Sequence, residues 1–372
     1  MSDMNSVAPR LSICIPTYSR AELLEFCLAT VLPQVAEFEE EVECVVCDNG
    51  SPDHTPKVIE TYARQFPFLR TFRNHENIGV LGNFSRVVSE HAKGEYVWLI
   101  GDDDAVTVGA VGRVLAAIRP ASVGGSVPGL IALNVGFLPR EMRPSLEETN
   151  GGIQLSSEKL LRSATVSGTF EMETILEGPC ADFTAVYSVV MLREYWTAFY
   201  PETCFDEPFQ SVETTYPHAA IIADRCVDKH VGLVTDPSIM IFEMDSTEFS
   251  WAKYASRNVI VFATELLIRF QRQGVSRRVM DPYFRYQLNH RADAIGDLWW
   301  NRDTAGGFAD VVKFAYRMKR FPIALAKALW IAGMHDQAPG LIAHPLRGFY
   351  RVVRRLSRAG SCEARYQTKK PD

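Results

Sequence analysis

The sequence lacks the features that would place it across a membrane or along a nucleic acid. No apolar run approaches the roughly 20 uninterrupted residues that a membrane-spanning helix needs. Residues 1–10 show no basic region followed by an apolar one, so we expect no signal peptide. The formal net charge of -6 argues against a protein that coats nucleic acid along its length, and we expect no nucleic-acid partner. Internal repeats and low-complexity segments are also missing.

Closely spaced cysteines are almost absent. Cys44 and Cys47 form a C-x-x-C motif inside the apolar run 42–47, which predicts a buried strand. A spacing of three on a strand sends the two side chains to opposite faces, so they cannot share a metal. We therefore expect core cysteines in a reducing cytoplasm.

What remains is an ordinary globular composition. The 372 residues are 47% hydrophobic and 23% charged, which suits one large α/β domain with an appendage. We expect a nucleotide-sugar-binding and catalytic domain over residues 1–245. A helical C-terminal region, facing a membrane or a partner, follows over residues 246–372.

Short apolar runs alternate with stretches of helical periodicity in the first third of the chain. The predicted strands cover residues 11–15, 42–47, 69–72 and 96–100. The predicted helices between them cover residues 21–35, 55–65 and 80–91. This alternation implies right-handed βαβ crossovers, and so an α/β fold with a mainly parallel sheet flanked by helices. Further strands and helices are predicted downstream, at residues 130–135, 259–270, 282–300 and 308–318.

Polar loops follow the carboxyl ends of the predicted strands. They cover residues 17–20, 48–53, 74–79 and 102–104. Ligands bind at the carboxyl ends of strands in open parallel sheets. The four loops therefore predict one functional site at that edge.

Asp102, Asp103 and Asp104 stand together at the end of an apolar strand. Adjacent like charges raise each other's pKa and repel. A divalent cation removes that cost, and Mg²⁺ prefers one or two carboxylates completed by substrate phosphates. The alternative is a solvated turn before a helix over residues 106–118, with Asp104 or Thr107 as N-cap. The position at the strand end favours a metal.

Other residues of these loops have two interpretations each. Asp48 can accept hydrogen bonds from a base or ribose, or form an Asx turn before Gly50. Residues 77–79 can offer helix N-terminal amides to phosphate, or cap the helix. Arg20 and Arg73 can pair with phosphate or remain surface charges.

Four segments together resemble the family 2 glycosyltransferases of GT-A fold. They are Leu-Ser-Ile-Cys-Ile-Pro-Thr-Tyr-Ser-Arg from residue 11, Val-Val-Cys-Asp-Asn-Gly-Ser-Pro-Asp from residue 45, Asn-x-Gly-x-x-x-Asn from residue 77, and Gly-Glu-Tyr-Val-Trp-Leu-Ile-Gly-Asp-Asp-Asp from residue 94. The form with Trp98 and three aspartates is similar to the abequosyltransferase-like branch, which acts in bacterial surface-polysaccharide (O-antigen) assembly.

The resemblance implies inverting, metal-dependent transfer of a hexosyl or deoxyhexosyl group from a nucleotide-diphosphate sugar to a saccharide or lipid-linked saccharide acceptor. It implies donor contacts at Pro16, Thr17, Tyr18, Arg20, Asp48, Asn77, Gly79, Asp102 and Asp103. The commonest family pattern is Asp-x-Asp-Asp, and Gly101 replaces its first aspartate. We assign Mn²⁺ or Mg²⁺ to Asp103 and Asp104.

A second departure concerns the general base. Inverting members usually carry a Glu-Asp pair well past the aspartate motif, after a segment like Phe-Asp-Glu-x-Phe. Here Phe-Asp-Glu-Pro-Phe begins at residue 205, but the pair is Glu213 followed by Thr214. Glu213 is our first candidate base and Asp206 the second. Asp182 is a further option, and His218 either assists the site or is structural.

The C-terminal stretch 313–358 mixes basic and aromatic residues. Arg351, Arg354, Arg355 and Arg358 recur at helical spacing. A basic amphipathic helix can lie on an anionic membrane, where a lipid-linked acceptor would be found. The alternative is a surface helix packed on the catalytic domain, or a frayed tail. We expect a cytoplasmic protein with peripheral contact to the inner membrane face.

Two other functions compete with sugar transfer. A nucleotidyltransferase would carry a glycine-rich phosphate loop with a basic residue after the first strand, and residues 16–20 contain no glycine. A non-catalytic nucleotide-sugar-binding or scaffold protein stays open because position 214 is not an aspartate. Turnover with a suitable acceptor would exclude this second alternative.

Overall fold

The computed structural model describes residues 8–119, 127–149, 151–154, 157, 159–162, 164–177, 183–199, 207–242, 252–301 and 306–333. The chain divides into two compact units. The first comprises Met1–Glu248 with Ile268–Met280, and the second comprises Phe249–Leu267 with Asp281–Asp372. A functional domain boundary at residue 245 stays a proposal. All the predicted site residues belong to the first unit.

One sheet forms the centre of the first unit. Its strand order is β3-β2-β1-β4-β9-β6-β10-β5, and β7 pairs with β6 while β8 pairs with β10. The strands are β1 (Leu11–Thr17), β2 (Val42–Asp48), β3 (Arg70–Arg73), β4 (Tyr96–Leu99), β5 (Ala105–Val106), β6 (Leu130–Leu138), β7 (Lys159–Leu160), β8 (Gly168–Glu171), β9 (Val189–Leu192) and β10 (His230–Phe242). The predicted α/β class is therefore confirmed.

Parallel pairing covers the first four strands in the sheet. β2 pairs in parallel with β1 and β3, and β1 pairs in parallel with β4. Beyond β4 the pairing is mixed, because β9 is antiparallel to both β4 and β6. A strand that is antiparallel to both of its neighbours makes those neighbours parallel to each other. β6 therefore runs in the same direction as β4 and β1. The ends of β1, β2, β3, β4 and β6 therefore lie at one edge, which we call the carboxyl edge.

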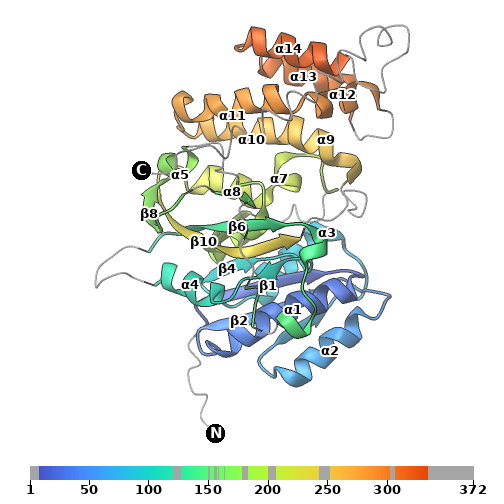
Figure 1. The fold of residues 1–372 in the computed structure, drawn as a ribbon, viewed down its shortest axis with the longest axis vertical. Coiled ribbons are helices and arrows are strands. Elements are labelled where there is room, and N and C mark those ends of the chain that lie inside the picture. The colour runs from blue at the N-terminus through green and yellow to red at the C-terminus, as the bar shows by residue number, and fades with distance from the viewer. Residues whose placement is uncertain are drawn as a thin grey trace. The chain divides into compact units, whose positions relative to one another are not determined.

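Helices cover both faces of this sheet. The helices of the first unit include α1 (Ala21–Ala36), α2 (Thr55–Gln65), α4 (Ala110–Ala117), α6 (Arg193–Phe199) and α8 (Pro217–Arg225). α1 packs against α2 and α4 on one face (Figure 1). α6 packs against α8 and against the π-helix η1 (Arg86–His91). Cys14 of β1 points toward η1, since its Sγ lies 3.9 Å from the Val87 carbonyl oxygen.

The core follows the two-residue period of the strands. Leu11, Ile13 and Ile15 of β1 are fully buried in a cluster with Leu24 and Leu28 of α1. Alternate strand residues therefore face α1, while those between them face η1. This packing on both faces fixes the strand ends that carry the polar loops.

Some predicted boundaries need correction. The helix expected over residues 106–118 begins only at Ala110, because Ala105–Val106 form β5 and Gly109 adopts a φ of 72°. The helix expected over residues 80–91 is divided into α3 (Gly79–Ser85) and η1. Pro16 does not end β1, which continues to Thr17 along β2 after its pairing with β4 has stopped at Cys14.

The remaining helices confirm a helical C-terminal region. They include α10 (Ala263–Arg272), α11 (Arg277–His290), α12 (Ala292–Trp300), α13 (Phe308–Arg317) and α14 (Pro322–Gly333). Within the second unit, Trp300 of α12 donates a hydrogen bond to the Ala332 carbonyl of α14 at 3.0 Å. In the part of the chain that the structure describes, no helix combines the length and apolar content needed to cross a bilayer.

Candidate active site

Two loops at the carboxyl edge hold the aspartate run. The Thr17 hydroxyl donates to Asp102 Oδ2 at 2.7 Å. One guanidinium nitrogen of Arg20 donates to Asp102 Oδ1 at 3.0 Å and to Asp103 Oδ2 at 3.1 Å. The structure therefore brings together the predicted residues that follow β1 and β4. Asp103 is the more accessible carboxylate of this pair, with a side chain 21% exposed against 6% for Asp102.

Gly101 is required by the arrangement of the neighbouring carboxylates. A Cβ atom at this position would lie 2.6 Å from Asp103 Oδ1 and 3.1 Å from Asp104 Oδ2. The Gly101 amide donates to Asp104 Oδ2 at 2.6 Å. The loss of the first aspartate of Asp-x-Asp-Asp thus leaves room in which two carboxylates face one another. Asp104 is not a helix N-cap, since α4 begins six residues later.

Burial shifts the ionisation of two of these aspartates. It raises the pKa of Asp102 to about 6, although Arg20 and the Thr17 hydroxyl oppose the shift. Burial and the Asp103 charge hold the pKa of Asp104 well above its ordinary value. Burial thus disfavours the ionised form of both carboxyl groups, and a cation bound beside them would favour that form.

Asp48 ends β2 at the same edge. Its Oδ1 accepts a hydrogen bond from the Ser51 amide at 3.0 Å, so the Asx turn is present. Its Oδ2 is buried and accepts no hydrogen bond from the described residues, although Arg73 Nη1 lies 3.4 Å away. A buried carboxylate oxygen without a donor fits the second interpretation, that of an acceptor for a nucleoside group.

An amide network connects the loops after β2 and β3. Asn49 Nδ2 donates to Asn77 Oδ1 at 2.8 Å and to the Gly79 carbonyl at 3.1 Å. Asn77 Oδ1 also accepts the Gly79 amide at 2.9 Å. The Gly79 amide, which one of the two interpretations offers to phosphate, is therefore already bonded to a side chain within the loop. Gly79 has a φ of 80°, a conformation that suits glycine.

The loop after β1 is tied to the loop after β2. The Ser19 amide donates to Ser51 Oγ at 2.8 Å, and the Arg20 amide donates to Thr55 Oγ1 at 3.2 Å. Ser19 has a φ of 53°, which is uncommon for a residue with a side chain. Tyr18 is left exposed beside this turn. The predicted convergence of polar loops at one edge is thus seen in direct hydrogen bonds.

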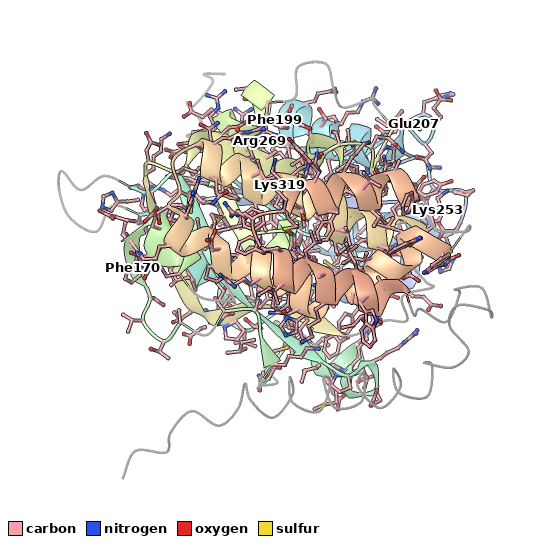
Figure 2. All side chains as sticks on the ribbon, turned by 90° about the horizontal axis from the view of Figure 1, so that it is seen from above. Phe170, Phe199, Glu207, Lys253, Arg269 and Lys319 are labelled. Atoms are coloured by element: carbon pink, nitrogen blue, oxygen red, sulfur yellow. The ribbon has the colours of Figure 1, made fainter. Side chains whose placement is uncertain are left out.

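The candidate base lies on another element. Glu213 is on α7 (Val212–Thr215) and accepts a hydrogen bond at 2.6 Å from Arg269, labelled in Figure 2. Arg269 also forms a bidentate pair with Asp224, at 2.8 and 2.7 Å. Burial raises the pKa of Glu213, but hydrogen bonds from the backbone, Arg269 and Ser211 outweigh it and the net shift is downward. Glu213 is therefore ionised at neutral pH.

Thr214 performs a structural task. Its hydroxyl accepts the amides of Gln210 and Ser211 at 3.0 and 2.9 Å, while Ser211 Oγ accepts the Thr214 amide at 3.2 Å. This is a capping box at the start of α7. His218 is buried on α8. Asp206 and Asp182 lie outside the described residues, as do Arg351, Arg354, Arg355 and Arg358.

One loop of this edge was missed from the sequence. β6 continues to Leu138, three residues beyond its predicted end, and is followed by a short turn over Arg140–Met142. Because β6 runs parallel to β1, this turn begins at the carboxyl edge. The signal in the sequence is the pair Arg140 and Arg143 after an apolar run.

The aspartate run fits a metal that is shared with a ligand. Among the described residues, no three His, Cys, Asp or Glu side chains are grouped to hold a metal alone. Mg²⁺ needs only one or two carboxylates when phosphate and water complete its shell. Asp103 and Asp104 both border the space over Gly101, and they supply those two carboxylates. Asp103 is the more open of the two.

Comparison with known proteins agrees with the motifs. Residues 12–171 match the family model described as Glycosyl transferase family 2. This range overlaps all four motifs, so the resemblance is confirmed. Together with the α/β sheet, the match confirms the GT-A fold class that the motifs implied.

Individual relatives match over shorter stretches. The chain is 38% identical to the abequosyltransferase RfbV of Salmonella typhimurium over 97 residues, 26% of this chain and 28% of that protein. It is 30% identical to the GalNAc(5)-diNAcBac-PP-undecaprenol beta-1,3-glucosyltransferase of Campylobacter jejuni over 108 residues, 29% of this chain and 34% of that protein. The chain thus spans about a third or less of the length of these two relatives.

A solved structure of similar size was also found. The mannosyltransferase PcManGT from Pyrobaculum calidifontis, in complex with GDP-Man and Mn²⁺, is 15% identical to this chain with a TM-score of 0.48. The alignment covers 98% of this chain and 89% of that one.

Proposed function

We propose that this chain, with the family 2 glycosyltransferase sequence over residues 12–171, transfers a sugar from a nucleotide-diphosphate donor to an acceptor hydroxyl. The observation that carries the proposal is the cluster of Thr17, Arg20, Asp102 and Asp103 at the carboxyl edge. It combines hydrogen-bond acceptors for a ribose with carboxylates for a cation. The transferred group would be a hexosyl or deoxyhexosyl unit.

The donor would lie across the carboxyl edge. Asp48 Oδ2, buried and without a hydrogen bond from the described residues, would accept from the nucleoside. Asp102 would bind the ribose, with Thr17 fixing its carboxylate. Tyr18 offers an exposed ring beside them. Pro16, Asn77 and Gly79 would shape the neighbouring loops. These roles follow the family positions and stay proposals.

Asp103 and Asp104 would hold Mn²⁺ or Mg²⁺ together with the donor. A bound cation supplies stabilisation of the negative charge that develops on the leaving diphosphate. Arg20 already neutralises part of the charge on Asp102 and Asp103. Arg20 would therefore keep Asp102 and Asp103 oriented before the donor arrives.

Transfer would invert the anomeric configuration. A carboxylate would take the proton of the acceptor hydroxyl while the oxygen attacks from the face opposite the diphosphate. Glu213 is the first candidate for this base and Asp206 the second. Inversion rests on family analogy. Anomer analysis of the product tests it, and retention of configuration would contradict it.

The pathway proposed is assembly of a bacterial surface polysaccharide or another glycan. One partial relative is an abequosyltransferase, and another carries undecaprenol in the name of its substrate. A saccharide or lipid-linked saccharide is therefore the proposed acceptor. The alternative, a non-catalytic binding or scaffold protein, is kept by Thr214, which caps a helix where inverting members carry an aspartate.

The first test is thermal unfolding with UDP, GDP, CDP and dTDP, each with and without Mn²⁺ or Mg²⁺. A nucleotide at about a hundred times its dissociation constant should add about 2.7 kcal/mol. That is a shift of a few degrees for a chain of this size. We expect a metal-dependent shift with one nucleotide, and its loss in Asp103→Ala. No shift with any nucleotide would contradict the proposed donor site.

A membrane contact is proposed for the C-terminal unit. Phe308, Val312 and Tyr316 recur every fourth residue on α13 and are all exposed, and on α14 Ile323 is 86% exposed and Trp330 48%. Residues 306–333 carry five lysines and arginines against one aspartate. Lys319, labelled in Figure 2, lies 4.0 Å from the Tyr316 ring centroid. Exposed apolar groups beside cations suit an anionic bilayer.

Vesicle sedimentation measures this contact. The protein should sediment with vesicles that contain phosphatidylglycerol and less with neutral phosphatidylcholine vesicles. Ile323→Ser combined with Trp330→Ser should reduce the bound fraction severalfold, because less apolar side-chain area can then be buried in the bilayer. Val166→Ser, an exposed apolar residue of the first unit, is the matched control. Equal sedimentation of all three proteins would argue against the α13 and α14 surface.

A further inference from the structure

Arg143 lies on a loop of the carboxyl edge to which the motifs assign no role. It directly follows the turn Arg140–Met142 at the end of β6. β9 is antiparallel to both β4 and β6, so β6 ends at the same edge as β4 and the aspartate run. The fold therefore delivers a basic loop to the site from a strand distant in sequence.

The Arg143 guanidinium is positioned by an aromatic ring. Its central carbon lies 3.8 Å from the ring centroid of Phe26, on α1. Phe26 is buried in a cluster that includes Ala105, the residue directly after Asp104. This cation–π contact with a buried ring restricts the position of the guanidinium.

This guanidinium has no anionic partner within the described part of the chain, where no carboxylate oxygen lies within ion-pair distance of it. Burial lowers the pKa of Arg143, and the neighbouring Arg140 lowers it further; Glu22 and Asp103 oppose these effects without reversing them. Arg20 differs, since it is paired with two aspartates. A half-buried cation without a close anion is costly, and an incoming anion would remove that cost.

We propose that Arg143 binds the diphosphate of the donor. This inference rests on the proposed function. A guanidinium matches phosphate oxygens through paired N–H donors. The contact of Arg143 with Phe26, whose cluster includes Ala105, places it on the side of the aspartate run. Arg143 would thus contact the phosphates from the β6 side, while Asp103 and Asp104 contact them through the cation. It acts as a binding residue and takes no part in proton transfer.

Inorganic pyrophosphate tests the subsite without any nucleoside or acceptor. Thermal unfolding and calorimetric titration are done on the full chain, with a chelator present so that no divalent metal contributes. We expect pyrophosphate to bind the wild type and Arg143→Gln to weaken it about tenfold to a hundredfold, the range for a charged hydrogen-bonded contact. Arg140→Gln, three residues away and exposed, should bind as the wild type does.

A nucleotide series separates this inference from the proposed function. If one nucleoside diphosphate binds, Arg143→Gln should weaken it by a similar factor and leave the matching nucleoside within about twofold. The subsite would be overturned if Arg143→Gln weakened the nucleoside and the nucleoside diphosphate by the same factor. Unchanged binding of pyrophosphate in this variant would also overturn it. If the wild type binds pyrophosphate but no nucleotide, the proposed function fails and the anion subsite stands.

The unliganded unfolding temperature shows whether each variant is folded. Arg143→Lys serves as a second variant, because it keeps the charge but loses the planar fork. We expect it to retain part of the pyrophosphate affinity. A residue that only supports Phe26 would instead lower the unfolding temperature in both variants without a selective loss of phosphate binding.

Discussion

Replacing Asp103 by asparagine should lower turnover about a thousandfold. The substitution keeps the size of the side chain and one oxygen, but removes the charge that the proposed cation needs. A metal contributes several kcal/mol to transition-state stabilisation, and about 4 kcal/mol corresponds to about a thousandfold in rate. Arg20 keeps its contact with Asp102 in the variant, so the loop should stay folded. The measurement is sugar transfer with saturating donor, at the lowest Mn²⁺ concentration that saturates the wild type.

Two comparisons make this result specific. Asp236→Asn removes an exposed carboxylate of the same unit and should leave turnover unchanged. Raising the Mn²⁺ concentration should restore part of the activity of Asp103→Asn, because Asp104 and the donor phosphates remain as ligands. Wild-type turnover in Asp103→Asn at limiting metal would show that this carboxylate does not hold the cation.

Much of the donor half of the site could be predicted because it depends on local patterns. The strand at residues 96–100 is a continuous apolar run, and the strand at residues 42–47 is interrupted only by Glu43, as expected for strands buried on both faces. Their polar ends follow directly in the sequence. Once parallel pairing is inferred, Asp48 and Asp102 must lie at one edge, and the structure places them there.

The misses depend on contacts between distant segments. The position of Arg143 could not be predicted from the sequence. It follows from the insertion of β9 between β4 and β6 with antiparallel pairing to both, which makes β6 end at the same edge as β4. The helix predicted from residue 106 starts late because Ala105 and Val106 pair with Met240 and Ile239 of β10. Such pairing overrides the helical propensity of the segment. No periodicity within residues 105–118 reports a partner so far away in sequence.

Replacing Glu213 by glutamine should lower kcat about a hundredfold with little change in KM. General-base catalysis contributes about a hundredfold to ten-thousandfold. We expect the lower end, because Arg269 and the other hydrogen bonds lower the pKa of Glu213 and make it a weaker base. Asp206→Asn is the matched comparison, since it removes the other candidate. A loss confined to Asp206→Asn would transfer the role to that residue.

The pH profile separates a base from a residue that only supports α7. A general base must be ionised, so activity falls as the pH drops through its pKa. The downward shift of Glu213 places that fall below the ordinary glutamate value of about 4.3. Arg269→Gln removes a hydrogen bond and a positive charge that stabilise the ionised carboxylate. The pKa of Glu213 should then rise, and the acidic limb of kcat should move to higher pH. If Glu213 only supports α7, Arg269→Gln should lower the unfolding temperature and leave the acidic limb of the kcat profile where it is in the wild type.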